Sequence, residues 1–161
     1  MTAKHLTKLL PLVVVLFLVG CAATAPQSDM TPLEIQSMQT RDYEESADVV
    51  FPSVVSVFQD LGYTIESADR ASGFINARSA ADSDLASRIL LGVTRVSQTK
   101  ATGFIETIGE RTRVRANFVD ATETSSGWGQ QDRAETPILE PQAYQNAFER
   151  IENAIFVRSA N

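Results

Sequence analysis

Two segments of the chain carry apolar residues at helical spacing. Between residues 48 and 61, and again between residues 142 and 156, apolar side chains recur every three or four positions. Gly62 and Pro141 stand where a first helix ends and a second begins. We predict two long helices, the first capped by Ser46 or Asp48 and regular only from Asp48, because Pro52 is costly deeper in a helix. The predicted stripes are Val50, Val54, Val57, Phe58 and Leu61, then Tyr144, Phe148, Ile151 and Ile155.

Alternating apolar and polar residues predict two β-hairpins. Residues 63–68 and 73–79 flank a polar turn, and residues 101–108 and 111–119 flank Gly109-Glu110. Glycine at the first turn position indicates a type II′ turn, which sets Ile105 opposite Val114 and Glu106 opposite Arg113. We also expect an edge strand in residues 35–44, a short helix in residues 85–96 and a long loop in residues 121–139.

The two predicted helices need a partner surface, and an antiparallel sheet offers one apolar face. The predicted order is β-α-β-β-(short α)-β-β-α. We therefore expect one α+β domain over residues 33–161, with an antiparallel sheet of about five strands and two long helices packed on one face, a two-layer sandwich.

The amino terminus predicts export to the cell envelope. Residues 1–8 are basic, and residues 9–19 form an apolar run too short to span a bilayer, so residues 1–20 fit a signal peptide. Leu18-Val19-Gly20-Cys21 resembles the lipobox of bacterial lipoproteins, which implies cleavage before Cys21 and lipid attachment to its sulfur. The alternative is an ordinary signal peptide with a chance cysteine. Residues 21–32 then form the lipidated terminus and a small, polar tether.

The residue after the cysteine bears on localisation. Ala22 resembles the default sorting signal for the outer membrane. We expect a protein held by its lipid anchor on the cell outer membrane and facing the periplasm.

The composition excludes several kinds of site. Loss of residues 1–20 removes His5, the only histidine, and with Lys4 and Lys8 changes the formal net charge from −6 to −8. The remaining chain lacks the residues for a Ser-His-Asp or Cys-His catalytic site and for a zinc site with Cys/His ligands. Negative charge opposes non-specific binding of nucleic acid. We expect no catalytic residue, metal, cofactor or nucleic-acid partner.

Candidate partner-binding residues lie on the second hairpin and in the expected loop. Arg111, Arg113 and Arg115 alternate, so they project from one face of a strand, and Phe104 lies on the same face of its neighbour. That face is either a binding surface or a solvated face with one cross-strand ion pair to Glu106. Trp128 is either an exposed recognition residue or a plug that tucks the loop onto the domain.

Several stretches resemble an uncharacterised family of bacterial envelope lipoproteins. The order of helix, Leu-Gly-Tyr at 61–63, strand, Ala-Asp at 68–69, turn and Gly-Phe-Ile at 73–75 also resembles the repeated domains of BamC, an accessory lipoprotein of outer-membrane β-barrel assembly. This chain has one such unit where BamC has two. The stretches that carry the family resemblance are residues 39–43, 57–65, 68–69, 73–77, 113–118 and 144–156.

The resemblance implies a helix-grip-like fold, and the anchor, the tether and the single domain leave two functions open. The first is a non-enzymatic structural or interaction module of the envelope, with a protein partner and an accessory role in outer-membrane assembly. The alternative is a module that binds a lipid or small apolar ligand in a cavity between sheet and helices. Small residues that would make room for such a cavity are Gly103, Ala116, Ala147 and Ala154.

Overall fold

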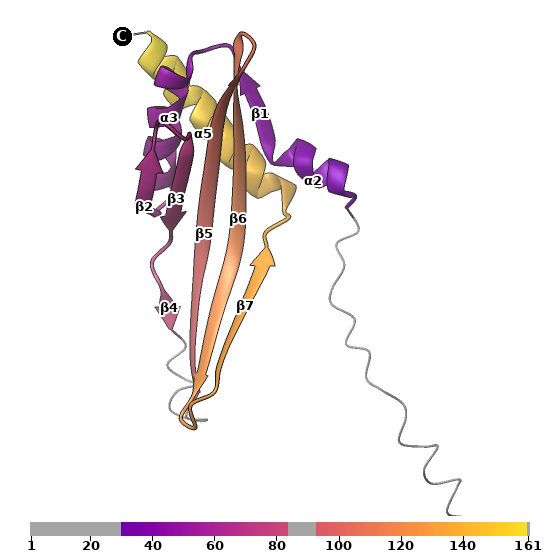
Figure 1. Cartoon of the computed structure of the whole chain (residues 1–161), viewed down its shortest axis with the longest axis vertical. Coiled ribbons are helices and arrows are strands. Elements are labelled where there is room, and N and C mark those ends of the chain that lie inside the picture. Colours follow the sequence, from indigo (N-terminus) through magenta and orange to yellow (C-terminus); the bar gives the residue numbers. More distant parts are fainter. Residues whose placement is uncertain (1–29, 84–92, 161) are drawn as a thin grey trace, which may run out of the picture.

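The computed structural model describes residues 30–83 and 93–160 and is of mixed α+β architecture (Figure 1). All pairs of neighbouring strands are antiparallel, and the sheet has the order β1-β6-β5-β3-β2, with β4 pairing to β5 and β7 to β6. The elements are α2 (Pro32–Met38), β1 (Thr40–Tyr43), α3 (Ala47–Asp60), β2 (Thr64–Asp69), β3 (Phe74–Arg78), β4 (Asp82–Ser83), β5 (Val93–Ile108), β6 (Arg111–Ser126), β7 (Gln131–Pro137) and α5 (Pro141–Ser159).

Helices α3 and α5 pack side by side on one face of the sheet, which confirms the predicted two-layer α+β sandwich (Figure 1). Alternate residues of β3, β5 and β6 point at the helices and are buried. The predicted helical stripes face this layer, and Phe58 is fully buried at its centre. The sheet contributes Ile75, Ala77, Ala101, Ile105, Val114, Ala116 and Phe118 to the core.

Both long helices begin and end close to the predicted residues. Helix α3 begins at Ala47, one residue before Asp48, with Ser46 in the cap position but without a side-chain hydrogen bond. Pro52 lies inside α3, where only about one turn precedes it, so little regular helix is interrupted. Pro141 opens α5 as predicted.

The predicted edge strand over residues 35–44 is wrong in its first half. Residues up to Met38 belong to helix α2, and only Thr40–Tyr43 form a strand. Thr31 caps α2, because its hydroxyl accepts a hydrogen bond from the Glu34 amide while the Glu34 carboxylate accepts one from the Thr31 amide. This reciprocal cap stabilises the start of the helix. Most residues of the segment are polar, so the sequence shows no apolar repeat at helical spacing.

The two predicted hairpins are confirmed, and the second is longer than expected. Strands β5 and β6 pair over 16 residues each, with Ile105 opposite Val114 and Glu106 opposite Arg113 as predicted. Gly109 alone of the two turn residues has a positive φ, as a type II′ turn requires.

Two other predictions for this region are wrong. Residues 93–96 lie in β5 rather than in a helix, and residues 85–92 of that predicted helix lie outside the described residues. Residues 121–139 are not a loop, because β6 continues to Ser126 and β7 pairs back onto it. Serine and threonine recur on both faces here, so no apolar alternation marks these strands in the sequence.

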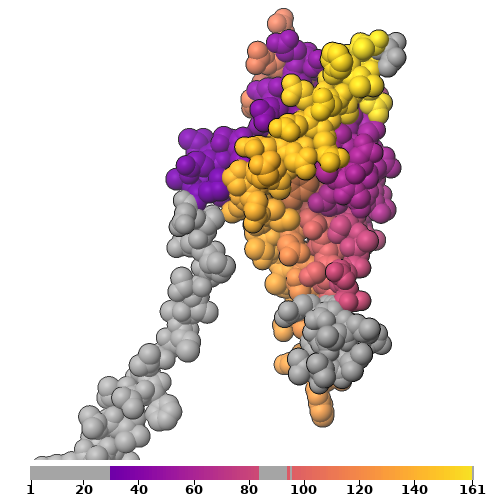
Figure 2. All heavy atoms as spheres, turned by 180° about the vertical axis from the view of Figure 1, so that it is seen from behind, coloured from indigo at the N-terminus to yellow at the C-terminus, as the bar shows by residue number. Residues whose placement is uncertain are grey.

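The paired ends of β5, β6 and β7 extend away from the helices as a narrow projection, which we call the arm (Figures 1 and 2). It comprises residues 93–100 of β5 and residues 119–137, which run from the second half of β6 through the turn into β7. Within the described ranges, no helix has both the length and the apolar character needed to cross a membrane.

Candidate functional site

The sheet face opposite α3 and α5, here called the open face, carries the polar and aromatic residues that alternate with the core. A single row crosses four strands on this face, because Phe74 pairs with Phe104, Phe104 with Arg115, and Arg115 with Thr40. Residues that pair directly across antiparallel strands project to the same side. The register therefore places two aromatic rings and a guanidinium next to one another.

Phe74 and Phe104 form a stacked pair that faces outward. Their ring centroids lie 4.6 Å apart with the planes inclined by 35°. Phe74 remains 51% exposed, and Phe104 is half-buried. Sequence reasoning proposed Phe104 but missed Phe74, which follows from the pairing of β3 with β5, a contact between two hairpins.

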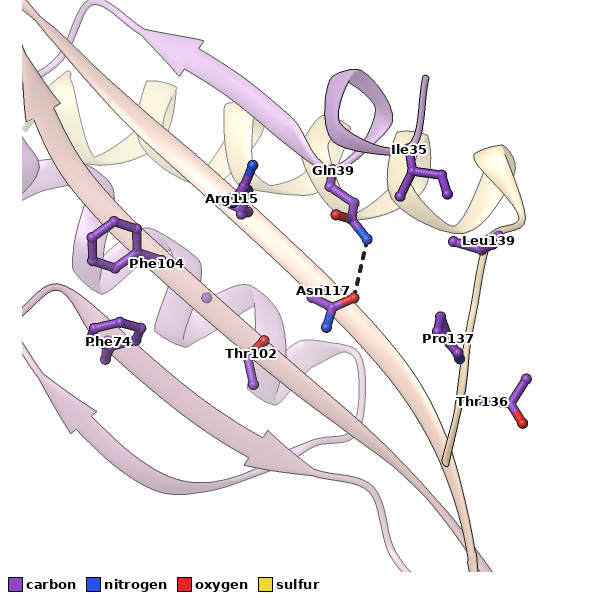
Figure 3. Close-up of a pocket in the computed structure, with 11 residues that line it drawn as sticks. Ile35, Gln39, Phe74, Thr102, Phe104, Arg115, Asn117, Thr136, Pro137 and Leu139 are labelled. Carbon is purple, nitrogen blue, oxygen red and sulfur yellow. Dashed lines mark hydrogen bonds between the residues drawn. The ribbon is translucent and has the colours of Figure 1, made fainter. Parts of the chain in front are cut away.

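A groove of about 750 Å³ lies beside this row, and Figure 3 shows the residues that line it. Phe74 borders one side, while Ile35 of α2, Pro137 at the end of β7 and Leu139 after it border the other. Its floor is polar at Thr102, Arg115 and Asn117. The groove thus combines apolar walls with one cationic side chain.

The far wall lies in the gap between β1 and β7, which pair with the same edge of β6 at residues 112–115 and 119–125. Here the Tyr144 hydroxyl of α5 donates a hydrogen bond to the Ile138 carbonyl at 2.9 Å and accepts one from the Phe118 amide at 3.4 Å. Gln39 follows α2, and its Nε2 donates to Asn117 Oδ1 at 3.2 Å. These bonds hold α2 and the segment before α5 against the edge of β6.

The three predicted arginines have different surroundings. Arg113 makes two hydrogen bonds to Asp42, so the expected ion pair with Glu106 is replaced by one with β1. Glu106 is Arg113's strand partner as predicted, but β1 brings Asp42 opposite the same residue. The hydrogen bonds from Arg113 hold the pKa of the Asp42 carboxyl below its usual value.

The other two arginines are less engaged. Arg111 lies 4.0 Å from Glu44 and is well exposed. Arg115 makes no ion pair with any described residue, and it lines the groove beside Phe104. The structure therefore brings Phe104 and Arg115 together and leaves Arg113 occupied by a neighbouring strand.

Trp128 lies apart from this surface, in the turn between β6 and β7 at the end of the arm. Its side chain is 96% exposed, so it does not tuck onto the domain as a plug. Cys21, the predicted lipidation site, lies outside the described residues.

No protein-family model matches the chain, and no curated protein matches it. In the ranges that the structure describes, no three His, Cys, Asp or Glu residues group closely enough to hold a metal ion. The side chains of the open face offer apolar contact, aromatic stacking and a guanidinium with five donors.

The seam between helices and sheet is closely packed at the glycine proposed to make room there. A Cβ atom at Gly103 would lie 3.6 Å from the Phe58 ring and from Ile75, which is ordinary van der Waals contact. Ala116 and Ala147 are buried in the same core. A methyl group at Gly103 would therefore fit against Phe58 and Ile75.

Proposed function

We propose that the protein is a lipid-anchored lipoprotein of the outer membrane that faces the periplasm and acts without catalysis, by binding an envelope protein on its open face. An accessory role in outer-membrane assembly is the finer part of this proposal, because the single unit resembles the repeated domains of BamC in pattern and order only. The lipobox at Cys21 supports the anchor.

The row of Phe74, Phe104 and Arg115 is the observation that carries the binding role. Aromatic residues and arginine are enriched at the centres of protein interfaces and dominate their binding energy. Here both kinds lie together beside a groove, and Arg115 has no ion-pair partner among the described residues. We infer a partner segment that places an apolar side chain against the phenylalanines and a carboxylate on Arg115.

A photo-crosslinking phenylalanine analogue at position 104, in the full chain in its native envelope, tests this proposal. We expect a crosslink to one envelope protein that disappears when Arg115→Glu reverses the charge. Arg150→Glu makes the same charge change on the exposed side of α5 and should leave the crosslink intact. Crosslinks that are equal in both variants would show that the groove is not the docking site.

Intact-mass spectrometry of the purified protein tests the anchor separately. The expected species begins at Cys21 and carries acyl chains, and Cys21→Ser should abolish them. An unmodified cysteine in the wild type would refute the anchor.

The alternative, a lipid or small apolar ligand held between sheet and helices, gives a different result. Native mass spectrometry would then detect a bound molecule beyond the acyl chains on Cys21. At Gly103 a methyl group would already touch Phe58 and Ile75 at 3.6 Å, and a lipid needs far more room, which favours the protein-binding role.

A further inference from the structure

The arm ends in an exposed tryptophan with no charged neighbour in its turn. Trp128 is the chain's only tryptophan, and no charged residue lies between Glu123 and Asp132. The turn is closed by two backbone hydrogen bonds, from the Ser126 amide to the Gln130 carbonyl and from the Gly129 amide to the Ser126 carbonyl, both 3.0 Å long. Glu123, one of the charges nearest the turn, is paired with Arg133 across β6 and β7.

We propose that the tip of the arm, residues 125–131, inserts Trp128 into the interfacial region of the bilayer that holds the lipid anchor. Tryptophan is enriched at membrane–water interfaces, where its ring meets the headgroups and its N–H remains hydrated. Charged side chains at membrane depth are costly, and the tip has none. This inference rests on the proposed anchoring of the chain.

The lengths of the arm and the tether agree with simultaneous contact. Thr31 is the tenth residue after Cys21, and ten residues of any chain reach at most about 35 Å. Along β6, the path from Asn117, which Gln39 contacts, to Ser126 is about 30 Å. An anchored chain that emerges at α2 can therefore place the tip on the bilayer.

The shape of the molecule favours a membrane over a protein pocket. Among the described residues the arm is narrow and projects beyond both long helices, so its end reaches a flat surface first (Figures 1 and 2). Tryptophans that dominate protein interfaces are surrounded by further contacts that exclude water. Around Trp128 the chain offers only glycine, serine and glutamine.

Contact at two points would orient the domain. The tip and the lipid would hold the arm toward the bilayer, so the groove beside Asn117 would face the periplasm about 30 Å above it. A partner that binds at Arg115 would then bind at a fixed distance from the bilayer.

Fluorescence of the lone tryptophan tests the proposal. The lipidated full chain is reconstituted into phosphatidylethanolamine–phosphatidylglycerol vesicles with and without brominated phosphatidylcholine, which quenches only fluorophores that enter the bilayer. We expect the emission of Trp128 to shift to shorter wavelength and to lose most of its intensity in the brominated vesicles.

A matched control moves the fluorophore to the opposite end of the molecule. The double variant Trp128→Phe, Phe156→Trp carries its only tryptophan near the C-terminal end of α5, where Phe156 is 72% exposed. Its emission should change little. Unquenched Trp128, or equal quenching in both proteins, would overturn the proposal. So would shielding of Trp128 that requires added envelope proteins, since that result indicates a protein pocket.

The two proposals fail in distinguishable ways. An acylated Cys21 with unquenched Trp128 leaves the anchor standing and refutes insertion of the tip. If Cys21 is found unmodified, its thiol is coupled to a maleimide phospholipid, which holds the chain at the same residue. Quenching in those vesicles then still decides whether the tip inserts.

Discussion

Arg113 and Asp42 are joined by two parallel hydrogen bonds across the outer edge of the sheet. Nε lies 2.7 Å from Oδ1 and one terminal guanidinium nitrogen 2.9 Å from Oδ2. This two-pronged geometry fits the fixed fork of arginine. Strand β1 has only four residues, so the pair is one of its few side-chain attachments to β6.

Replacing Asp42 with asparagine should lower stability at neutral pH and have less effect in acid. Arg113 lowers the pKa of Asp42 in the folded state, so the pair stabilises the fold above the unfolded-state pKa of about 3.9. That contribution is lost as the pH falls through the folded-state pKa. Urea unfolding of wild type and Asp42→Asn should therefore give midpoints that differ at pH 7 and converge at the lowest pH values.

Asp48→Asn provides the control for loss of one negative charge. Its carboxylate is 82% exposed and has a single contact to Arg70 at 3.4 Å. We expect a smaller effect at pH 7 than for Asp42→Asn. Equal effects would show that the two-pronged pair adds nothing to a simple charge change.

The pairing of Arg113 shows which contacts could be predicted from the sequence. Within one hairpin, the turn and the alternation of apolar residues fix the register, so Glu106 was correctly placed opposite Arg113. The attachment of β1 to β6 joins residues far apart in the chain, and its short, polar sequence carries no period that would reveal the partner. Asp42 was therefore missed.

The arm and the groove were missed for related reasons. In the arm the sheet extends beyond the hydrophobic core, at residues 121–126 and 131–137. Neither face of these strands packs on the core, so apolar and polar residues do not alternate along them. Phe74 was overlooked because its neighbour Phe104 belongs to a different hairpin. The helices were predictable because each has one face buried in the core, which imposes its spacing on the sequence.

Removing the Tyr144 hydroxyl should destabilise the protein, whereas removing that of Tyr43 should not. Tyr144→Phe leaves the Phe118 amide without its acceptor, and a buried group without a partner costs about 1–3 kcal/mol. The Tyr43 hydroxyl is buried with no hydrogen-bond partner in the described structure, so Tyr43→Phe should be neutral or stabilising. Urea unfolding measures both. The reverse order would contradict the hydrogen bonding at the edge of β6.

Truncation of the two core phenylalanines should be costly in both helices. Phe58 of α3 and Phe148 of α5 are buried on the sheet, so each change to alanine should cost about 3–5 kcal/mol. Phe156→Ala, on the exposed side of α5, is the matched control and should change stability little. Losses below about 1 kcal/mol at both buried positions would mean that the helices do not pack on this sheet face.

Alanine at Gly73 should be far more damaging than alanine at Gly62. Both residues have positive φ, which costs any other residue about 1–2 kcal/mol. At Gly73 a Cβ atom would also lie only 2.0 Å from the Ile105 carbonyl oxygen, whereas at Gly62 nothing lies within 4 Å. Thermal unfolding compares the two variants. Similar losses would show that β3 and β5 do not approach as closely as the structure has them.

Of the three arginines on the open face, we expect one to stabilise the fold, one to bind the partner and one to do neither. Arg113→Gln removes the bonds to Asp42 and should lower the urea midpoint, while the crosslink from position 104 persists in the folded protein. Arg115→Gln breaks no ion pair of the described structure and should weaken the crosslink without changing stability. Arg111→Gln should change neither strongly, because its nearest carboxylate lies 4.0 Å away.

The triple variant combines these effects and should still fold, since all three side chains lie on the side of the sheet away from the core. Circular dichroism and urea unfolding establish folding before the crosslink is measured. Failure of the triple variant to fold would show that the arginines are held within the domain. Loss of the crosslink with Arg113→Gln rather than Arg115→Gln would place the partner over β1. If the crosslink survives all three changes, the groove beside Arg115 is not the docking site.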